Sequence, residues 1–286
     1  EINMRLGLHL SISKGLGNVA TTAEKLGCEA FQIFIGNPRG WGRKPLDVSD
    51  VREFQKQVKR SVLGPVAVHL SYLPNPAADD EDLYEKSIIA MGEDYRRAVE
   101  IGADYFVVHP GKAGNQSLER AISKVAMGMK TILSTVKGKT IFLLENQAGG
   151  GREIAGRISE LGMILKEVNC PERTGICLDT CHAFVAGYDL RCQQGLNQLL
   201  TEIQETVGLS RMPLLHLNDA LGALGSHLDR HANIGEGQIG LKGFRLLLSD
   251  QRTSQLAGVL ETPKVSADDD RRNLAILRQL LRGGGK

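Results

Sequence analysis

Short apolar runs alternate with longer amphipathic stretches along the whole chain. The runs are rich in valine, isoleucine, leucine and phenylalanine, a composition typical of strands that are buried on both faces. Eight runs are predicted as strands, at residues 5–10, 30–35, 66–70, 105–109, 140–145, 174–179, 213–217 and 257–261.

The stretches between the runs follow the helical period. The clearest predict helices at residues 49–61, 82–101, 118–136, 152–168, 193–207 and 268–281. Glycines follow several helical stretches, where a left-handed C-cap is expected; these are Gly27, Gly102, Gly138 and Gly208.

Eight strand–helix units in a row, with no Pro/Ser-rich linker between them, predict an α/β fold of the (β/α)8 TIM-barrel type. The prediction is a single domain over residues 1–286, with 1–4 as an N-terminal extension and 283–286 as a frayed tail. A doubly wound open sheet is the alternative.

Composition and net charge add little to the prediction of fold or function. The 286 residues are 42% hydrophobic, enough for one large domain, and the net charge of +2 gives no global signal for a nucleic-acid or membrane partner. No apolar stretch approaches the roughly 18–20 residues that span a bilayer, and the start, Glu-Ile-Asn-Met, lacks the pattern of a signal peptide. Five cysteines without a CxxC motif favour a reducing compartment over a disulfide framework.

Residues able to bind a metal stand at the C-terminal ends of the predicted strands, where TIM barrels carry their chemistry. The sixth strand leads into LDTCH (178–182), whose turn adds His182, and Asp229 and His231 stand two residues apart, so that both can face one point. A single such residue is more often a core histidine or a helix cap, but six of eight strands repeat the pattern. The strand-end donors are His69, His109, Glu145, Asp179, His216 and Glu261.

These nine donors, five histidines and four carboxylates, are too many for one ion, because a catalytic zinc takes about three protein ligands. Three dications against four carboxylates leave a positive charge that a hydroxide and a phosphodiester would neutralise. Clustered metals of this kind generate a nucleophile and stabilise the attacking and leaving oxygens of phosphoryl transfer. The ligand types favour zinc, with manganese or iron next.

Seven motifs in order resemble the endonuclease IV family of apurinic/apyrimidinic (AP) endonucleases, from about Arg5 to the last predicted helix. They are HLSYLPN (69–75), VVHPG (107–111), LLEN (143–146), GICLDTCHAFVAGYD (175–189), HLND (216–219), DRHANIGEGQIG (229–240) and LET (260–262). The resemblance implies three zinc ions per chain. The first is held by His69, His109 and Glu145, the second by the bridging Glu145 with Asp179, His216 and Glu261, and the third by His182, Asp229 and His231.

The resemblance also implies the activity: hydrolysis of DNA 5′ to an abasic site, leaving a 3′-hydroxyl and a 5′ deoxyribose phosphate, together with trimming of blocked 3′ ends. Arg39, in the loop GNPRGW (36–41), matches the position that enters the duplex. Tyr72 and Leu73 match the wedge that fills the space left by an everted nucleotide, although they could equally pack the third loop. His9 matches a family histidine that is not a metal ligand.

The resemblance implies catalytic roles for two glutamates. Glu145 positions the first two metals, and Glu261 also orients or deprotonates the water. The expected substrate is double-stranded DNA with abasic or 3′-blocked sites, and the expected protein is a monomer with no membrane partner. It is expected in a reducing intracellular compartment that holds DNA, whether cytoplasm, nucleoid, nucleus or an organelle.

Two other interpretations stay open. A metal-dependent sugar-phosphate isomerase or epimerase on the same kind of barrel could use Glu145, Asp179, His216 and Glu261, but it needs only one or two metals. A catalytically silent DNA-damage-binding protein or zinc scaffold would keep the ligands without the chemistry. Metal content distinguishes the isomerase from a nuclease. Incubation with a duplex that carries one tetrahydrofuran abasic analogue distinguishes the silent binding protein, which would not cut it, from a nuclease.

Overall fold

A closed barrel of eight parallel strands forms the centre of the computed structural model, which describes residues 4–266 and 268–283. Each strand pairs with its sequence neighbours, and the first pairs with the last, which excludes an open sheet and confirms the (β/α)8 prediction. The strands are β1 (Arg5–Leu10), β2 (Ala30–Phe34), β3 (Val66–His69), β4 (Tyr105–Val108), β5 (Ile141–Glu145), β6 (Thr174–Asp179), β7 (Leu214–His216) and β10 (Ala257–Leu260).

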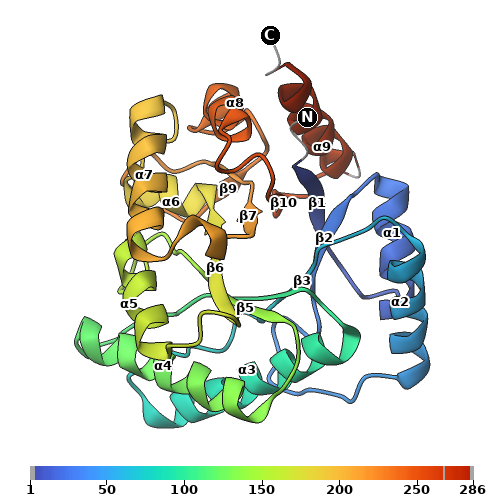
Figure 1. The fold of residues 1–286 in the computed structure, drawn as a ribbon, viewed down its shortest axis with the longest axis vertical. Helices are drawn as coiled ribbons and strands as arrows, with labels where there is room; N and C mark the ends of the chain where they lie inside the picture. Colours follow the sequence, from blue (N-terminus) through green and yellow to red (C-terminus); the bar gives the residue numbers. More distant parts are fainter. Residues whose placement is uncertain (1–3, 267, 284–286) are drawn as a thin grey trace.

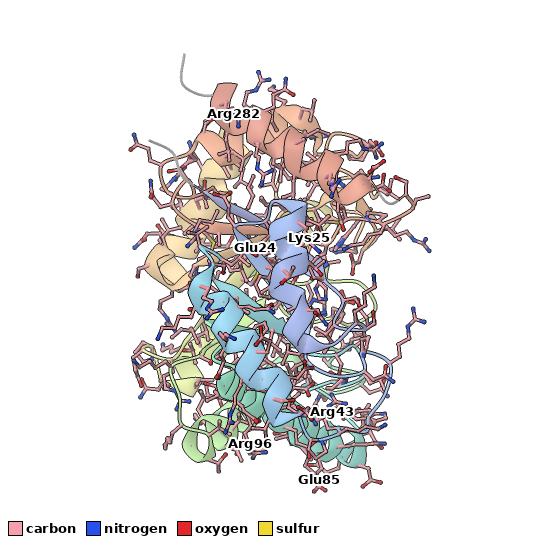
Figure 2. All side chains as sticks on the ribbon, turned by 90° about the vertical axis from the view of Figure 1, so that its right-hand side faces the viewer. Glu24, Lys25, Arg43, Glu85, Arg96 and Arg282 are labelled. Carbon is pink, nitrogen blue, oxygen red and sulfur yellow. The ribbon has the colours of Figure 1, made fainter. Side chains whose placement is uncertain are left out.

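Helices surround the barrel, as Figure 1 shows, and α9 in red lies beside β1 in dark blue. Figure 2 shows α1 and α2 side by side on the outside. A short antiparallel pair, β8 (Asp219–Ala220) and β9 (His231–Ala232), follows β7. The α-helices are α1 (Val19–Leu26), α2 (Val48–Arg60), α3 (Glu81–Ile101), α4 (Leu118–Thr135), α5 (Ile158–Val168), α6 (Thr180–Ala186), α7 (Gln193–Thr206), α8 (Gly240–Ser249) and α9 (Asp269–Gly283).

Two local predictions were wrong. The helix predicted from residue 152 begins at Ile158, because Arg152 and Ala155 adopt left-handed φ angles of 70° and 63° in the preceding loop. Gly138 is not a left-handed cap: α4 ends at Val136 in an extended conformation. A Cβ atom at position 138 would lie 2.5 Å from a methyl group of Val99, so close packing explains this glycine.

At each end of the predicted domain, the structure places one residue differently from the prediction. Met4 was assigned to an N-terminal extension, but it is buried in the core, and Gly283 was assigned to the tail but is the last residue of α9. The remainder of both predicted ends, residues 1–3 and 284–286, lies outside the described residues.

The alternation of side chains along each strand directs polar residues into the top of the barrel. In β5, Leu143 faces the small interior cluster, whereas Phe142 and Leu144 pack outward against the helices. Glu145 follows Leu143 by two residues and points inward one layer above it. In β6 the same step from Cys177 leads to Asp179. The barrel therefore has an apolar floor and a polar layer at the C-terminal ends of its strands.

Within residues 4–266 and 268–283, no helix is both long enough and apolar enough to cross a lipid bilayer.

Candidate metal centre

All nine predicted donors lie at the C-terminal rim of the barrel. We call them together the ligand cluster. Four are the last residues of strands: His69, Glu145, Asp179 and His216. Two directly follow a strand, His109 and Glu261, and His182 lies in α6. His231 begins β9, and Asp229 precedes it by two residues.

Glu145 lies at the centre of the ligand cluster and is fully buried. Its Oε2 atom is 3.0 Å from Nε2 of both His69 and His109, and its Oε1 atom is 2.9 Å from Nδ1 of His216. Burial alone would raise the pKa of this carboxyl group, but the neighbouring histidines, His216 foremost, hold it well below its usual range. Glu145 is therefore a carboxylate whose two oxygens face different sets of donors.

Two further groups converge from different parts of the chain. Glu145, Asp179, His216 and Glu261 each place one ligand atom within 4.8 Å of the others, and so do His182, Asp229 and His231. In the second group Oδ1 of Asp229 is 3.2 Å from Nε2 of His182 and 3.5 Å from Nε2 of His231.

The turn after β6 explains how LDTCH serves two groups at once. Asp179 caps α6: its Oδ1 atom accepts a hydrogen bond from the backbone N–H of His182 at 2.8 Å. The capped turn fixes the direction of the His182 side chain, while Oδ2 of Asp179 accepts a hydrogen bond from Asn218 at 2.6 Å.

The histidines expected around the first metal are less clearly grouped. His69 groups with Glu145 and His216, whereas His109 groups with Glu145 and His182. The two imidazoles share Oε2 of Glu145, and their ring centroids are 5.1 Å apart. The structure brings every predicted donor to one rim, but it does not separate a His69–His109–Glu145 group from its neighbours.

The hydrogen bonds of the imidazoles test whether the residues fit a metal. Ligating histidines donate their second ring N–H to a fixed oxygen, which leaves the other nitrogen free to bind the ion. Four histidines in the ligand cluster have such a partner. The pairs are His69 with the carbonyl of Leu70 at 2.7 Å, His182 with that of Asn146 at 2.8 Å, His231 with that of Glu261 at 3.1 Å, and His216 with the side chain of Gln32 at 2.9 Å.

The ring nitrogens that face into the ligand cluster also fit a metal site. Nε2 of His231 is buried and has no hydrogen-bond partner among the described residues, although it faces Asp229 and Asp179. Burial opposes a charge on His182, yet Asp179, Asp229 and Glu145 raise its pKa well above the ordinary value. The ligand cluster therefore attracts positive charge, and its donor set fits metal ions.

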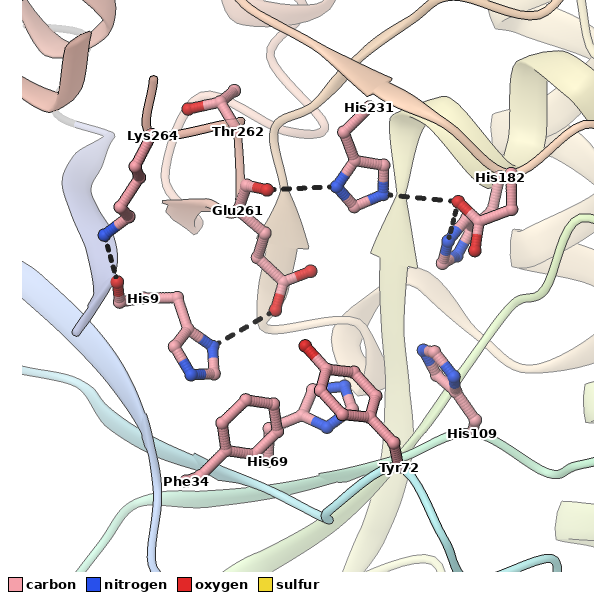
Figure 3. A pocket seen from close by; sticks show the side chains of 11 residues that line it. His9, Phe34, His69, Tyr72, His109, His182, His231, Glu261, Thr262 and Lys264 are labelled. Atoms are coloured by element: carbon pink, nitrogen blue, oxygen red, sulfur yellow. Dashed lines mark hydrogen bonds and ion pairs between the residues drawn. The ribbon is translucent and has the colours of Figure 1, made fainter. Parts of the chain in front are cut away.

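A cavity of about 410 Å³ opens above the ligand cluster, and Figure 3 shows the side chains that line it. Glu261 and His231 face into it from one side, and Phe34 and Tyr72 from the other. The Tyr72 ring packs edge-on against Phe34 with centroids 5.0 Å apart, while 66% of the residue remains exposed. The ligand cluster is therefore accessible from outside past an exposed aromatic ring.

The other predicted DNA contacts lie in the two loops that meet at Tyr72. Leu73 is 37% exposed, and Arg39 is exposed in the loop after β2. The backbone N–H of Tyr72 donates to the carbonyl of Pro38 at 3.2 Å, so the two predicted contact loops touch each other.

Three supporting residues were missed by the sequence analysis. Gln32, Asn146 and Asn218 are all buried and all bond to members of the ligand cluster. Gln32 had a signal, since it is the single polar residue in the apolar run AFQIF, and both asparagines lie inside quoted motifs. His9, predicted to be near the metals without binding them, has Nδ1 at 3.3 Å from Oε1 of Glu261.

Comparisons with known proteins agree with this geometry. Residues 20–282 match the family model of the xylose isomerase-like TIM barrel. The probable endonuclease 4 of Halothermothrix orenii is 42% identical over 93% of this chain and 96% of its own length. The crystal structure of endonuclease IV from Thermus thermophilus is similar with a TM-score of 0.87 and 37% identity, over 98% of this chain and 99% of that one.

More distant structures share the fold alone. A D-tagatose 3-epimerase-like protein has a TM-score of 0.74 at 18% identity, covering 98% of each chain. A barrel of this type therefore also occurs in proteins named for sugar chemistry. The fold alone does not decide between a nuclease and a sugar-converting enzyme, so that choice depends on the ligand cluster.

Proposed function

Because the chain belongs to the endonuclease IV family of AP endonucleases, and is therefore a DNA-cleaving hydrolase of that type, we propose that it hydrolyses the phosphodiester 5′ to an abasic site in double-stranded DNA. The products are a 3′-hydroxyl and a 5′ deoxyribose phosphate. The same hydrolysis removes blocking groups from 3′ ends. The observation that carries the proposal is the meeting of five histidines and four carboxylates at one rim beneath an open cavity.

Three zinc ions per chain are proposed for the ligand cluster, with manganese or iron as alternatives at one or more positions. Two of the three ligand sets coincide with compact groups of donor atoms, and the shared Oε2 of Glu145 supports the other. The proposed sets are His69, His109 and Glu145; Glu145, Asp179, His216 and Glu261; and His182, Asp229 and His231.

Bound zinc supplies an activated water and neutralises charge on the phosphate ester. Glu145 would hold two of these ions, because its two oxygens face different donors. Glu261 lines the cavity with 18% of its side chain exposed, and its Oε1 atom is held by Gln32. Its Oε2 atom is proposed to orient the attacking water or to accept its proton.

Selection of damaged DNA is proposed to rest on Arg39, Tyr72 and Leu73. An abasic nucleotide has no base to stack, so its extrusion costs less than that of an intact nucleotide. The exposed ring of Tyr72 can fill the space left in the duplex. A monomer suffices, since one chain supplies every donor, and the free cysteines suit a reducing compartment that contains DNA.

A duplex with one tetrahydrofuran abasic analogue tests the proposal, because the analogue resists β-elimination and its cleavage marks hydrolysis. We expect incision 5′ to the analogue, loss of incision after removal of metal, and recovery with zinc. Glu261→Gln should bind this duplex but cut it far more slowly. Glu205→Gln, a carboxylate change at an exposed position of the outer helix α7, should behave as the wild type.

Each rival function predicts a different result. One divalent ion per chain with no incision would favour the isomerase, and three zinc ions with tight binding but no incision would favour a silent DNA-damage binder. Undiminished cutting by Glu261→Gln would remove that carboxylate from the chemistry.

A further inference from the structure

Gln32 is a fully buried side chain at the centre of the barrel, and it touches three titratable residues of the site. Its Oε1 atom is 2.9 Å from Nε2 of His216. Its Nε2 atom is 2.6 Å from Oε1 of Glu261 and 2.9 Å from Nδ1 of His9. All of its hydrogen-bonding atoms are therefore directed at members of the site or at His9.

Only one orientation of the Gln32 amide satisfies these contacts. The carboxylate of Glu261 only accepts hydrogen bonds, so the amide nitrogen has to face it. The amide oxygen then faces Nε2 of His216, and that nitrogen has to carry the proton. In the neutral imidazole, the form that binds a metal, Nδ1 of His216 then carries the lone pair.

That lone pair points into the ligand cluster. Nδ1 of His216 is 2.9 Å from Oε1 of Glu145, 3.4 Å from Oε2 of Glu261 and 4.0 Å from Oδ2 of Asp179. These are the other three members of the four-residue group proposed for the second metal.

His216 differs from the other hydrogen-bonded histidines of the ligand cluster. His69, His182 and His231 donate to backbone carbonyls, which the fold itself holds in place. His216 donates to a side chain, so the proton position of this one imidazole depends on the residue type at position 32.

We propose that Gln32 is a positioning residue that fixes His216 in the tautomer with a free Nδ1 atom and holds Glu261 beside it, so that both bind the second metal. The inference rests on the proposed metal function and adds a determinant of metal affinity outside the nine donors. A residue that holds a ligand in this way typically changes metal affinity 10–100-fold when it is removed.

Gln32→Met tests this role, because methionine has a similar length and makes none of the three hydrogen bonds. Zinc affinity is measured by competition with a chromogenic chelator. We expect one of the bound equivalents to weaken about 10–100-fold while the others keep their affinity. Gln116→Met is the matched control: Gln116 is also buried, but it donates to the carbonyl of Ala77 outside the ligand cluster.

A second readout reports the tautomer directly. In long-range ¹⁵N–¹H spectra of the zinc-loaded protein, we expect one histidine signal of the Nε2–H form to be lost in Gln32→Met. Gln32→Glu retains an acceptor for His216, so it should keep that signal while losing the donor to Glu261. The Gln32→Glu spectrum also serves if Gln32→Met does not fold.

The outcomes distinguish a failure of the proposed function from a failure of the proposed role of Gln32. If the wild type neither binds about three zinc ions nor cuts the tetrahydrofuran duplex, the proposed function fails. If the wild type does both, but Gln32→Met keeps full zinc affinity and all histidine signals, the proposed role of Gln32 is overturned.

Discussion

A buried ion pair beneath the predicted DNA contacts gives a prediction with a magnitude. Arg43 donates to both oxygens of Asp94, from Nε at 2.9 Å and from Nη2 at 2.8 Å, and each side chain is 2% exposed. The same guanidinium donates to the carbonyl of Gly40 and to the hydroxyl of Ser71, both at 2.7 Å. Arg43 therefore ties the loop after β2 and the loop after β3 to Asp94 in α3.

Asp94→Ala should cost about 3–5 kcal/mol in the free energy of unfolding, because it leaves a buried guanidinium without its counter-charge. For a chain of this length the unfolding entropy is roughly 0.6 kcal/mol/K, so the melting temperature should fall by about 5–8 °C. Burial raises the pKa of Asp94 even though Arg43 opposes the shift, which indicates that dehydration of the pair is expensive. Arg43→Met combined with Asp94→Leu should therefore cost less than Asp94→Ala alone.

The assay is thermal unfolding of the metal-loaded protein, followed by binding to abasic and intact duplexes. Because Asp94→Ala removes the attachment of Arg43, and with it both loops, to α3, it should also reduce the preference for abasic DNA. Glu53→Ala is the control, since its ion pair with Lys56 is exposed and its loss should not measurably change the melting temperature. A melting temperature of Asp94→Ala within about 1 °C of the wild type would refute the reasoning on the buried pair.

Three further predictions concern the surface and the thiols. Tyr72→Ala should leave binding to intact duplex unchanged and weaken the preference for abasic DNA in competition assays; an unchanged preference would make this loop structural. The logarithm of the binding constant for the abasic duplex, measured by fluorescence anisotropy, should fall linearly with the logarithm of the salt concentration, with a slope that counts the phosphate contacts; a flat response would contradict those contacts. In the native protein at pH 8, iodoacetamide should modify only the partly exposed Cys170 and Cys192. The other three thiols, Cys28, Cys177 and Cys181, are buried, and burial raises the pKa of each, to about 12 for Cys28 and Cys177. More than two adducts by mass spectrometry without denaturant would contradict this.

The sequence by itself determined the series of strand–helix units and the position of their chemistry. The alternation of apolar runs with helical periods indicates parallel strands covered on both faces, whereas the pairing of β1 with β10 in the structure decided between a barrel and an open sheet. The donors could be located because the C-terminal ends of parallel strands all lie at one rim, whatever the separation of Glu145 and Glu261 along the chain.

Only the tertiary structure decided how the donors meet. Distances such as that from His69 to Glu145 depend on side-chain rotamers and on barrel stagger, which a linear pattern does not contain. The role of Gln32 was hidden for the same reason, because its partners lie 184 and 229 residues away in sequence. Local pattern encodes the element in which a residue lies, but hydrogen bonds between strand ends arise only when the barrel closes.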